Sequence, residues 1–188
     1  MSTTNGTVEA RRRAIFATVE KKFGFIPNLV RELAESPAVA EAYLSATGAL
    51  ASGVLSGSDQ QAVQLTVSAY NDCHYCTAVH GTVGRSLGFT DGDLEAILSG
   101  SLPENARLRT IVEATRLVLD KRGWLSPADV QALEESGISR AELYEVIAYV
   151  GAKTITNYIN HIAGTVVDRP FSAVTELPAY RLAVAEKA

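Results

Sequence analysis

The sequence has few of the features that mark secreted, membrane or nucleic-acid-binding proteins. Two cysteines occur among 188 residues, and 17 basic against 21 acidic residues give a net charge of −4 with no basic stripe. We therefore expect no nucleic-acid partner, since a phosphate backbone needs clustered cations. The arginines at 11–13 precede no uninterrupted apolar stretch, and no run approaches membrane-spanning length. These absences predict a cytoplasmic protein with no membrane contact.

The chain also lacks the alternation of apolar and polar residues that predicts strands. Hydrophobic residues make up 47% of the sequence and recur mostly three or four positions apart, which is typical of helices. We expect one all-α domain over 1–188, because this length can bury a single core. Residues 1–7 are expected to be disordered, and 166–188 to form a tail that either wraps a neighbouring subunit or is loosely attached.

Helix starts are marked by a recurring pattern of an apolar residue, Ser or Thr, two residues and an acid. It occurs at Ser56–Asp59, Thr90–Asp93, Ser126–Asp129 and Ser139–Glu142. These pairs resemble capping boxes, which satisfy amides in the first helical turn. With short connections between them, the predicted helices pack as a compact bundle. They span about 8–22, 28–35, 37–54, 57–70, 73–87, 91–99, 104–122, 127–136, 140–150 and 152–165.

A weak internal repeat accompanies these helices. Shifting the chain by 84 residues places Asn157 and Asn160 on Cys73 and Cys76, and Glu145 on Gln61. We interpret this as two related helical hairpins around a pseudo-twofold axis.

Both cysteines lie in the segment "NDCHYCTAVH", residues 71–80. In a reducing compartment a Cys-x-x-Cys pair is more often catalytic or metal-binding than a structural disulfide. Asn71 and Asp72 are favoured N-cap residues, so the pair is expected to begin a new helix. Cys73, Cys76 and His80 then project from nearly one face.

This arrangement favours an ionised thiol. A thiol with a pKa near 8.5 is only about 3% thiolate at pH 7, and a pKa of roughly 6 raises that to about 90%. The helix dipole favours the anion on Cys73, whereas His80 favours it on Cys76. A thiolate that attacks an O–O bond becomes a sulfenic acid, which a neighbouring cysteine converts into a disulfide.

Two other interpretations of the pair remain open. The cysteines can be two small buried core residues. A zinc ion can be held by Cys73, Cys76, His80 and either His74 or His161, although the sequence contains no second CxxC and no HxxxH.

Taken with its surroundings, the motif resembles a known family. Cys-x-x-Cys-x-x-x-His after a helix that begins Leu-Ser is similar to the AhpD-like alkylhydroperoxidases of the carboxymuconolactone decarboxylase superfamily. The segments "FGFIPNLVRELAESPAVAEAYLSATGAL", "HGTVGRSLGFTDGDLEAILSG" and "NYINHIAG" resemble its peroxidase-related branch, so that the similarity spans about 23–167. The resemblance implies an AhpD-like helical bundle, trimers or hexamers, and thiol-dependent peroxide reduction without metal or organic cofactor.

By position, the resemblance implies that Cys76 is the peroxidatic thiol, Cys73 its resolving partner and His80 a proton relay. Two positions depart from the family pattern, because Gln61 replaces the relay glutamate and Tyr75 replaces a histidine. Glutamine cannot stabilise a charged imidazole, so His80 is expected to be neutral more often and activity to be weak, unless Asp72 or Glu145 supplies the charge. Ser58 and Gln61 also fit a capping box, in which case Gln61 only holds a helix end.

The predicted function is therefore that of a hydroperoxide reductase recharged by an external dithiol, which the resemblance suggests is of lipoyl or thioredoxin type. A thiol sensor or binding protein without catalysis is the first alternative. Lactone decarboxylation is the second, and it ranks lower because family members with that activity lack the CxxC.

Overall fold

The computed structural model describes residues 2–185, with side chains for 7–181, and in this part every regular element is a helix. The all-α prediction is confirmed. No helix between residues 2 and 185 is long and apolar enough to cross a membrane. The elements are α1 (Ser2–Phe23), α2 (Asn28–Leu33), α3 (Pro37–Leu50), α4 (Gly57–Tyr70), α5 (His74–Ser86), α6 (Asp91–Leu98), α7 (Ala106–Lys121), α8 (Pro127–Glu135), α9 (Arg140–Ala163), the 3-10 helix η1 (Arg169–Glu176) and α10 (Pro178–Ala185).

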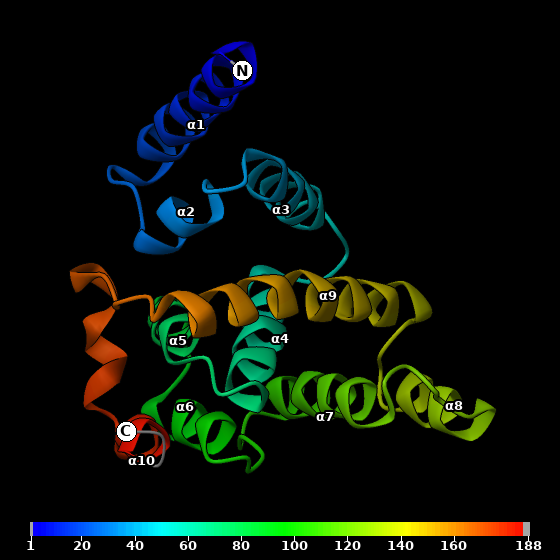
Figure 1. Ribbon diagram of the computed structural model, residues 1–188. Helices are drawn as coiled ribbons and strands as arrows, with labels where there is room; N and C mark the ends of the chain where they lie inside the picture. Colours follow the sequence, from blue (N-terminus) through cyan, green and yellow to red (C-terminus); the bar gives the residue numbers. More distant parts are fainter. Residues whose placement is uncertain (1, 186–188) are drawn as a thin grey trace.

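Helix α9 runs through the centre of the molecule, with α1–α3 on one side and α4–α8 on the other (Figure 1). It packs against α2, α3, α4, α5 and α7. The larger hydrophobic core joins α4, α6, α7 and α9, whereas a smaller one joins α1–α3 to the start of α5 and contains Cys73 and Cys76. The cysteines thus lie in the smaller core, next to the central helix.

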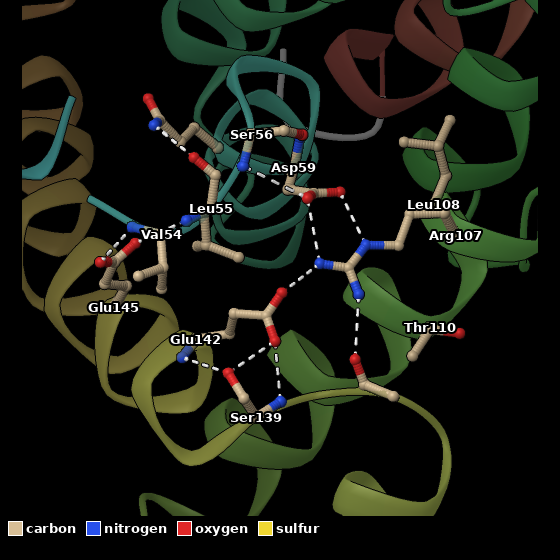
Figure 2. A network of polar contacts seen from close by, with 12 residues as sticks. Val54, Leu55, Ser56, Asp59, Arg107, Leu108, Thr110, Ser139, Glu142 and Glu145 are labelled. Carbon is tan, nitrogen blue, oxygen red and sulfur yellow. Dashed lines mark hydrogen bonds and ion pairs between the residues drawn. The ribbon is translucent and has the colours of Figure 1, made fainter. Parts of the chain in front are cut away.

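All four predicted capping boxes are present, with both hydrogen bonds formed in each. Two of them are linked by Arg107, whose guanidinium binds Asp59 at the start of α4 and Glu142 at the start of α9 (Figure 2). The Arg107 Nη2 atom lies 3.0 Å from Asp59 Oδ2 and 2.5 Å from Glu142 Oε1. Arg107 therefore fixes the relative position of α4 and α9, the helices that flank the cysteines.

Residues 140–163 form one continuous helix, where the sequence predicted two. The prediction of a second helical hairpin in the internal repeat is therefore wrong. The physical reason is that Gly151 lies inside α9 without ending it, since one interior glycine costs only about 1 kcal/mol. The buried face continues on both sides of it, from Tyr149 to Ala152 and Lys153.

The two ends of the chain are more regular than expected. Residues 2–7 belong to α1, because extending an existing helix is easier than starting one, and residue 1 lies outside the described part. Val174 in η1 is fully buried against Gly81 of α5, where a Cβ would lie 2.9 Å from Val174 Cγ1. Residues 166–181 therefore pack against the rest of their own chain. The prediction of a loosely attached tail is wrong for this stretch. Residues 186–188 lie outside the described part.

Candidate functional site

The turn between α4 and α5 places the two cysteines. Asp72 has a φ of 55°, a left-handed conformation that Asn and Asp tolerate better than most residues. The chain then reverses, and Cys73 becomes the N-cap of α5 in an extended conformation. The prediction that the motif begins a new helix is confirmed, with Cys73 in the N-cap position instead of Asn71 or Asp72. Cys76 follows in the first turn.

Both cysteines are free thiols that are almost fully buried, at 0% and 1% exposure. Their polar neighbours come from α9. The Asn160 Nδ2 atom lies 3.2 Å from Cys76 Sγ and 3.7 Å from Cys73 Sγ, and Thr156 Oγ1 lies 3.9 Å from Cys76 Sγ. One amide of α9 thus bridges the two sulfur atoms.

These neighbours make the two thiols chemically different. Burial disfavours ionisation of Cys76, but a hydrogen bond from the Cys73 thiol, the positive charge of Lys153 and hydrogen bonds from Asn157 and Thr156 lower its pKa to about 5. The pKa of Cys73 is raised instead, because its proton is held by Cys76 and because it is buried. The lowered pKa of Cys76 and the raised pKa of Cys73 favour a pair that shares one proton, with the negative charge on Cys76.

His80 lies between the side chains of Gln61 and Lys153. Within residues 7–181, no hydrogen bond joins its ring to either sulfur. Its Nδ1 atom is 2.9 Å from Gln61 Oε1, and its Nε2 atom is 2.7 Å from Lys153 Nζ. Because an ammonium only donates, Nε2 must accept, and the ring proton on Nδ1 is donated to Gln61. Complete burial and the charge of Lys153 lower the pKa of His80 well below its usual 6.5, so the ring is neutral as predicted.

Lys153 is the cation of the site. Its side chain is buried, with 1% exposure. Burial alone lowers an ammonium's pKa, but the negative charge of Cys76 and contacts with Tyr43 and Cys73 outweigh it, and the pKa of Lys153 is raised. The charges of Lys153 and Cys76 therefore favour one another electrostatically, and the ammonium donates a hydrogen bond to His80 Nε2.

A cavity with a volume of about 480 Å³ adjoins the motif. Cys73, Tyr75, Asn160 and Thr165 contribute to its wall, whereas Cys76 does not. Two polar atoms at this wall, Asn160 Oδ1 and Thr165 Oγ1, are buried without a hydrogen-bond partner among the described residues.

The structure brings together the four predicted site residues, but the contacts among them differ from those predicted. These residues are Cys73, Cys76, His80 and Gln61. His80 contacts Gln61 and Lys153, so the direct relay from His80 to Cys76 that the spacing suggested is not the observed arrangement. Gln61 does not cap α4, because Ser56 and Asp59 form the capping box. The side-chain oxygen of Gln61 accepts a hydrogen bond from His80 Nδ1 instead.

The contacts of Glu145 correct a further expectation, and those of Tyr75 show what replaces the family's histidine. Glu145 accepts hydrogen bonds from the amides of Val54 and Leu55, at 2.7 and 2.9 Å, and so supplies no charge to His80 (Figure 2). Tyr75 is buried and donates to Asp168 at 2.6 Å, which ties the start of α5 to the tail. Within the described residues, no three His, Cys, Asp or Glu side chains are grouped to hold a metal ion.

Sequence reasoning missed Lys153 and Asn160, the α9 residues that act on the sulfurs. A signal existed: Lys153, Thr156, Asn157 and Asn160 recur at helical spacing along one buried face of α9. The internal repeat also aligned Asn160 with Cys76. Polar residues on a buried helix face need partners, and here the partners are the thiols.

The comparisons with known proteins agree with this geometry. Residues 37–116 match the sequence model of the carboxymuconolactone decarboxylase family. The matched stretch contains Gln61, Cys73, Cys76 and His80 but ends before α9. A comparison of the sequence with curated proteins gives no match.

Solved structures share the fold over most of the chain. An alkylhydroperoxidase AhpD core protein described as peroxidase-related, from Ralstonia eutropha JMP134, is 23% identical with a TM-score of 0.75, covering 85% of this chain and 86% of that one. A peroxidase-related protein from Silicibacter sp. TM1040 is 19% identical with a TM-score of 0.74, covering 86% of each. The apo debrominase Bmp8 is 14% identical with a TM-score of 0.68, covering 96% and 95%. The predicted resemblance to the AhpD-like carboxymuconolactone decarboxylase superfamily is confirmed.

Proposed function

We propose that this protein reduces hydroperoxides through the Cys76 thiolate. The single observation that carries the proposal is the buried thiol pair in which α9 stabilises negative charge on one sulfur, beside a cavity. The thiolate is the nucleophilic form of cysteine, and its stabilisation by Lys153 and Asn160 keeps it populated at neutral pH. The peroxidase-related family context supports the same chemistry.

The reaction follows from the protonation states. The Cys76 thiolate attacks the outer oxygen of the peroxide, which forms a sulfenic acid and releases an alkoxide that takes up a proton. Lys153 is the buried acid of the site and supplies that proton. The Cys73 sulfur then attacks the sulfenic sulfur of Cys76, a disulfide forms, and the hydroxyl leaves as water with the proton of Cys73.

In this proposal His80 is a positioning residue. A neutral imidazole with its proton on Nδ1 offers only Nε2 to Lys153, and Gln61 fixes that tautomer by accepting from Nδ1. Because Gln61 carries no charge, it leaves the positive charge of the site on Lys153. The predicted weak activity no longer follows, since Lys153 supplies the positive charge that a protonated His80 would otherwise have to supply.

Single-turnover oxidation of the reduced protein tests the proposal. Addition of hydrogen peroxide or cumene hydroperoxide is expected to convert both thiols into one intramolecular disulfide. The Cys73→Ser variant is expected to accumulate a sulfenic acid on Cys76, detected by dimedone labelling, and the Cys76→Ser variant to lose the reaction. A pair that stays reduced in excess peroxide would leave the thiol sensor or binding protein as the better account.

Two control substrates separate the proposal from related chemistries. A carboxylated lactone tests the decarboxylation that names the family. A brominated pyrrole tests the reaction of the debrominase Bmp8, which has been solved with 2,3,4-tribromopyrrole. Turnover of either without peroxide reduction would replace the proposed function.

The expected homo-oligomer has a candidate contact surface on α9. Five large apolar residues are exposed along one face of this helix: Tyr144, Ile147, Ile155, Tyr158 and Ile162. Antiparallel pairing of two such helices would place Ile155 opposite Gly151, Tyr158 opposite Ala148 and Tyr144 opposite Ile162, so that each of these apolar residues meets an apolar or small one. This complementarity is what a two-fold contact between identical chains requires.

We propose that a second copy covers this face across a two-fold axis, as in the hexamer that the resemblance allows, since a cyclic trimer has no two-fold axis. The double variant Ile155→Glu with Tyr158→Glu is expected to lower the molar mass measured by light scattering, because it places charges in the contact. Trp124→Glu changes a large apolar residue elsewhere that is even more exposed, and it is the control. An unchanged mass in the double variant would exclude this surface.

A further inference from the structure

Lys153 holds a positive charge in a buried position with little to balance it. Its side chain is 1% exposed, and its ammonium donates to the neutral ring of His80 at 2.7 Å. The ring of Tyr43 on α3 lies 6.0 Å from Nζ, at cation–π distance. Among the described residues, ion pairs join carboxylates to arginines or to Lys121, and none includes Lys153. Its direct contacts in this part of the chain are therefore uncharged.

The charge that keeps the ammonium protonated is that of the thiolate. Burial lowers the pKa of Lys153, and the negative charge of Cys76 opposes burial more strongly than Tyr43 or Cys73 does. Oxidation removes this charge, because a cysteine in a disulfide is neutral. A fully buried lysine without an opposite charge has its pKa lowered by up to about 3–5 units, which makes it neutral near pH 8. Disulfide formation therefore removes what holds the proton on Lys153.

We propose that the charge of Lys153 follows the redox state of Cys76, so that the ammonium beside the thiolate becomes a neutral amine when the disulfide forms. The inference extends the proposed function, because it says where the proton of the reaction comes from and when that proton returns. It rests on the proposed function only for the identity of the oxidant. A disulfide made by any other oxidant should have the same effect on Lys153.

Protons and electrons then balance within the site. The Cys76 sulfur bonds to the outer peroxide oxygen, the O–O bond breaks, and the alkoxide takes a proton from Lys153 to leave as an alcohol. The Cys73 thiol displaces hydroxide from the sulfenic acid, and its proton completes a water molecule. The oxidised site holds a disulfide and an amine. Two electrons and two protons restore it, with one proton on Cys73 and one on Lys153.

His80 does not take the proton in place of the alkoxide. Complete burial lowers the pKa of His80 well below its usual 6.5, and its Nδ1 proton is already donated to Gln61. A neutral amine still has N–H groups, so Lys153 can donate to His80 Nε2 in both redox states. Oxidation thus changes the charge of Lys153 without requiring a change in its contacts.

NMR of isotope-labelled lysine measures this charge directly. The chain has five lysines, so the side-chain signals are few, and the Lys153→Met variant identifies the signal of Lys153 by its loss. We expect an ammonium at pH 8 in the reduced wild type and an amine after oxidation with diamide, which involves no peroxide. A Lys153 that stays an ammonium in the diamide-oxidised protein would overturn the inference.

Two serine variants separate the charge of Cys76 from the disulfide itself. Neither variant can form the disulfide, but Cys73→Ser keeps the Cys76 thiolate and Cys76→Ser removes it. An opposite charge nearby shifts a pKa by about 1–3 units, so Lys153 should lose its proton at a pH lower by that amount in Cys76→Ser. Equal titrations of Lys153 in the two variants would overturn the inference.

Proton counting at pH 8.5 gives a second readout. Diamide takes up two electrons and two protons for each disulfide that it forms. In the wild type Cys73 and Lys153 supply both protons, so a pH indicator in weak buffer should show no net uptake from solution. In Lys153→Met only Cys73 has a proton to give, and about one proton per disulfide should come from solution. Equal uptake by the two proteins would overturn the inference.

These outcomes separate the inference from the proposed function. If peroxide leaves the thiols reduced while diamide oxidises them, the peroxidase proposal fails and the charge of Lys153 is still measured. If peroxide forms the disulfide and Lys153 remains an ammonium, the inference fails and the peroxidase proposal stands.

Discussion

The two walls of the site contribute different chemistry. The α4–α5 side is interrupted by a left-handed turn and supplies the sulfurs, with Cys73 at the N-cap of α5. The α9 side is continuous and supplies Lys153, Thr156 and Asn160, the charge and hydrogen-bonding groups that act on them. A CxxC at a helix start brings two thiols together, and here the hydrogen bond between them acts with the charge and donors of α9 to lower the pKa of Cys76.

Removing the charge from α9 should have the largest effect on the thiols. In Lys153→Met we expect the pKa of Cys76 to rise by about 1–3 units, which lowers the rate of peroxide reaction at pH 6 by up to about 100-fold. The part of the loss caused by the smaller thiolate fraction should recover toward pH 9, whereas the part caused by the missing proton donor should remain. Stopped-flow measurement of thiol oxidation against pH checks this.

The control for this change is Lys121→Met, which removes a surface lysine paired with Asp129. It should leave the pH profile unchanged. A Lys153→Met profile that matches the wild type would show that α5 alone ionises the thiol.

Asn160 tests the hydrogen-bonding part of the same wall. Hydrogen bonds to charged groups contribute about 1.5–3 kcal/mol, so Asn160→Leu should raise the pKa of Cys76 by about 1–2 units. Asn160→Asp keeps the shape but adds a negative charge, and should raise the pKa further. Thiolate absorbance against pH measures both. Equal shifts in the two variants would mean that packing, not electrostatics, explains the effect.

Stability should depend on pH through the same groups. The folded pKa of Cys76, about 5, lies below its unfolded value near 8.5, so the unfolded chain binds more protons between these values. Stabilisation by this group is complete above about pH 8.5 and is lost as pH falls toward 5. The lowered pKa of His80 acts in the same direction below 6.5.

Urea unfolding under reducing conditions at pH 5.5, 7 and 8.5 checks this expectation. The difference in free energy of unfolding between the wild type and Cys76→Ser should grow with pH. A constant difference would contradict an ionised Cys76 in the folded protein.

The smallest effect is expected for Gln61→Glu, on the α4 side. The carboxylate would accept a hydrogen bond from His80 Nδ1, as Gln61 does. Its negative charge should raise the pKa of His80. Cys76 already has the charge of Lys153, so its pKa should change by less than about 1 unit. A fall in the pKa of Cys76 by more than about 1 unit would support the direct relay through His80.

The same division between the walls explains how much the sequence revealed. Features that depend on residues a few positions apart were predicted. They are the helix starts, the turn before Cys73, and the common helix face of Cys73, Cys76 and His80. The contact of His80 with Lys153 joins residues 73 positions apart, and that of Asn160 with Cys76 joins residues 84 apart. Such pairs depend on how α9 packs, and local spacing cannot show it. The division of 140–163 into two helices failed for the same reason, because burial of α9 overrides Gly151.

The most direct test is the pH titration of thiolate absorbance at 240 nm in the reduced wild type, Cys73→Ser and Cys76→Ser. The account predicts a transition near pH 5 in the wild type. It should be absent from Cys76→Ser and retained at low pH in Cys73→Ser, raised by the loss of the Cys73 hydrogen bond. A first transition near 8.5 in the wild type, or one that disappears only with Cys73, would contradict the claim that α9 ionises Cys76.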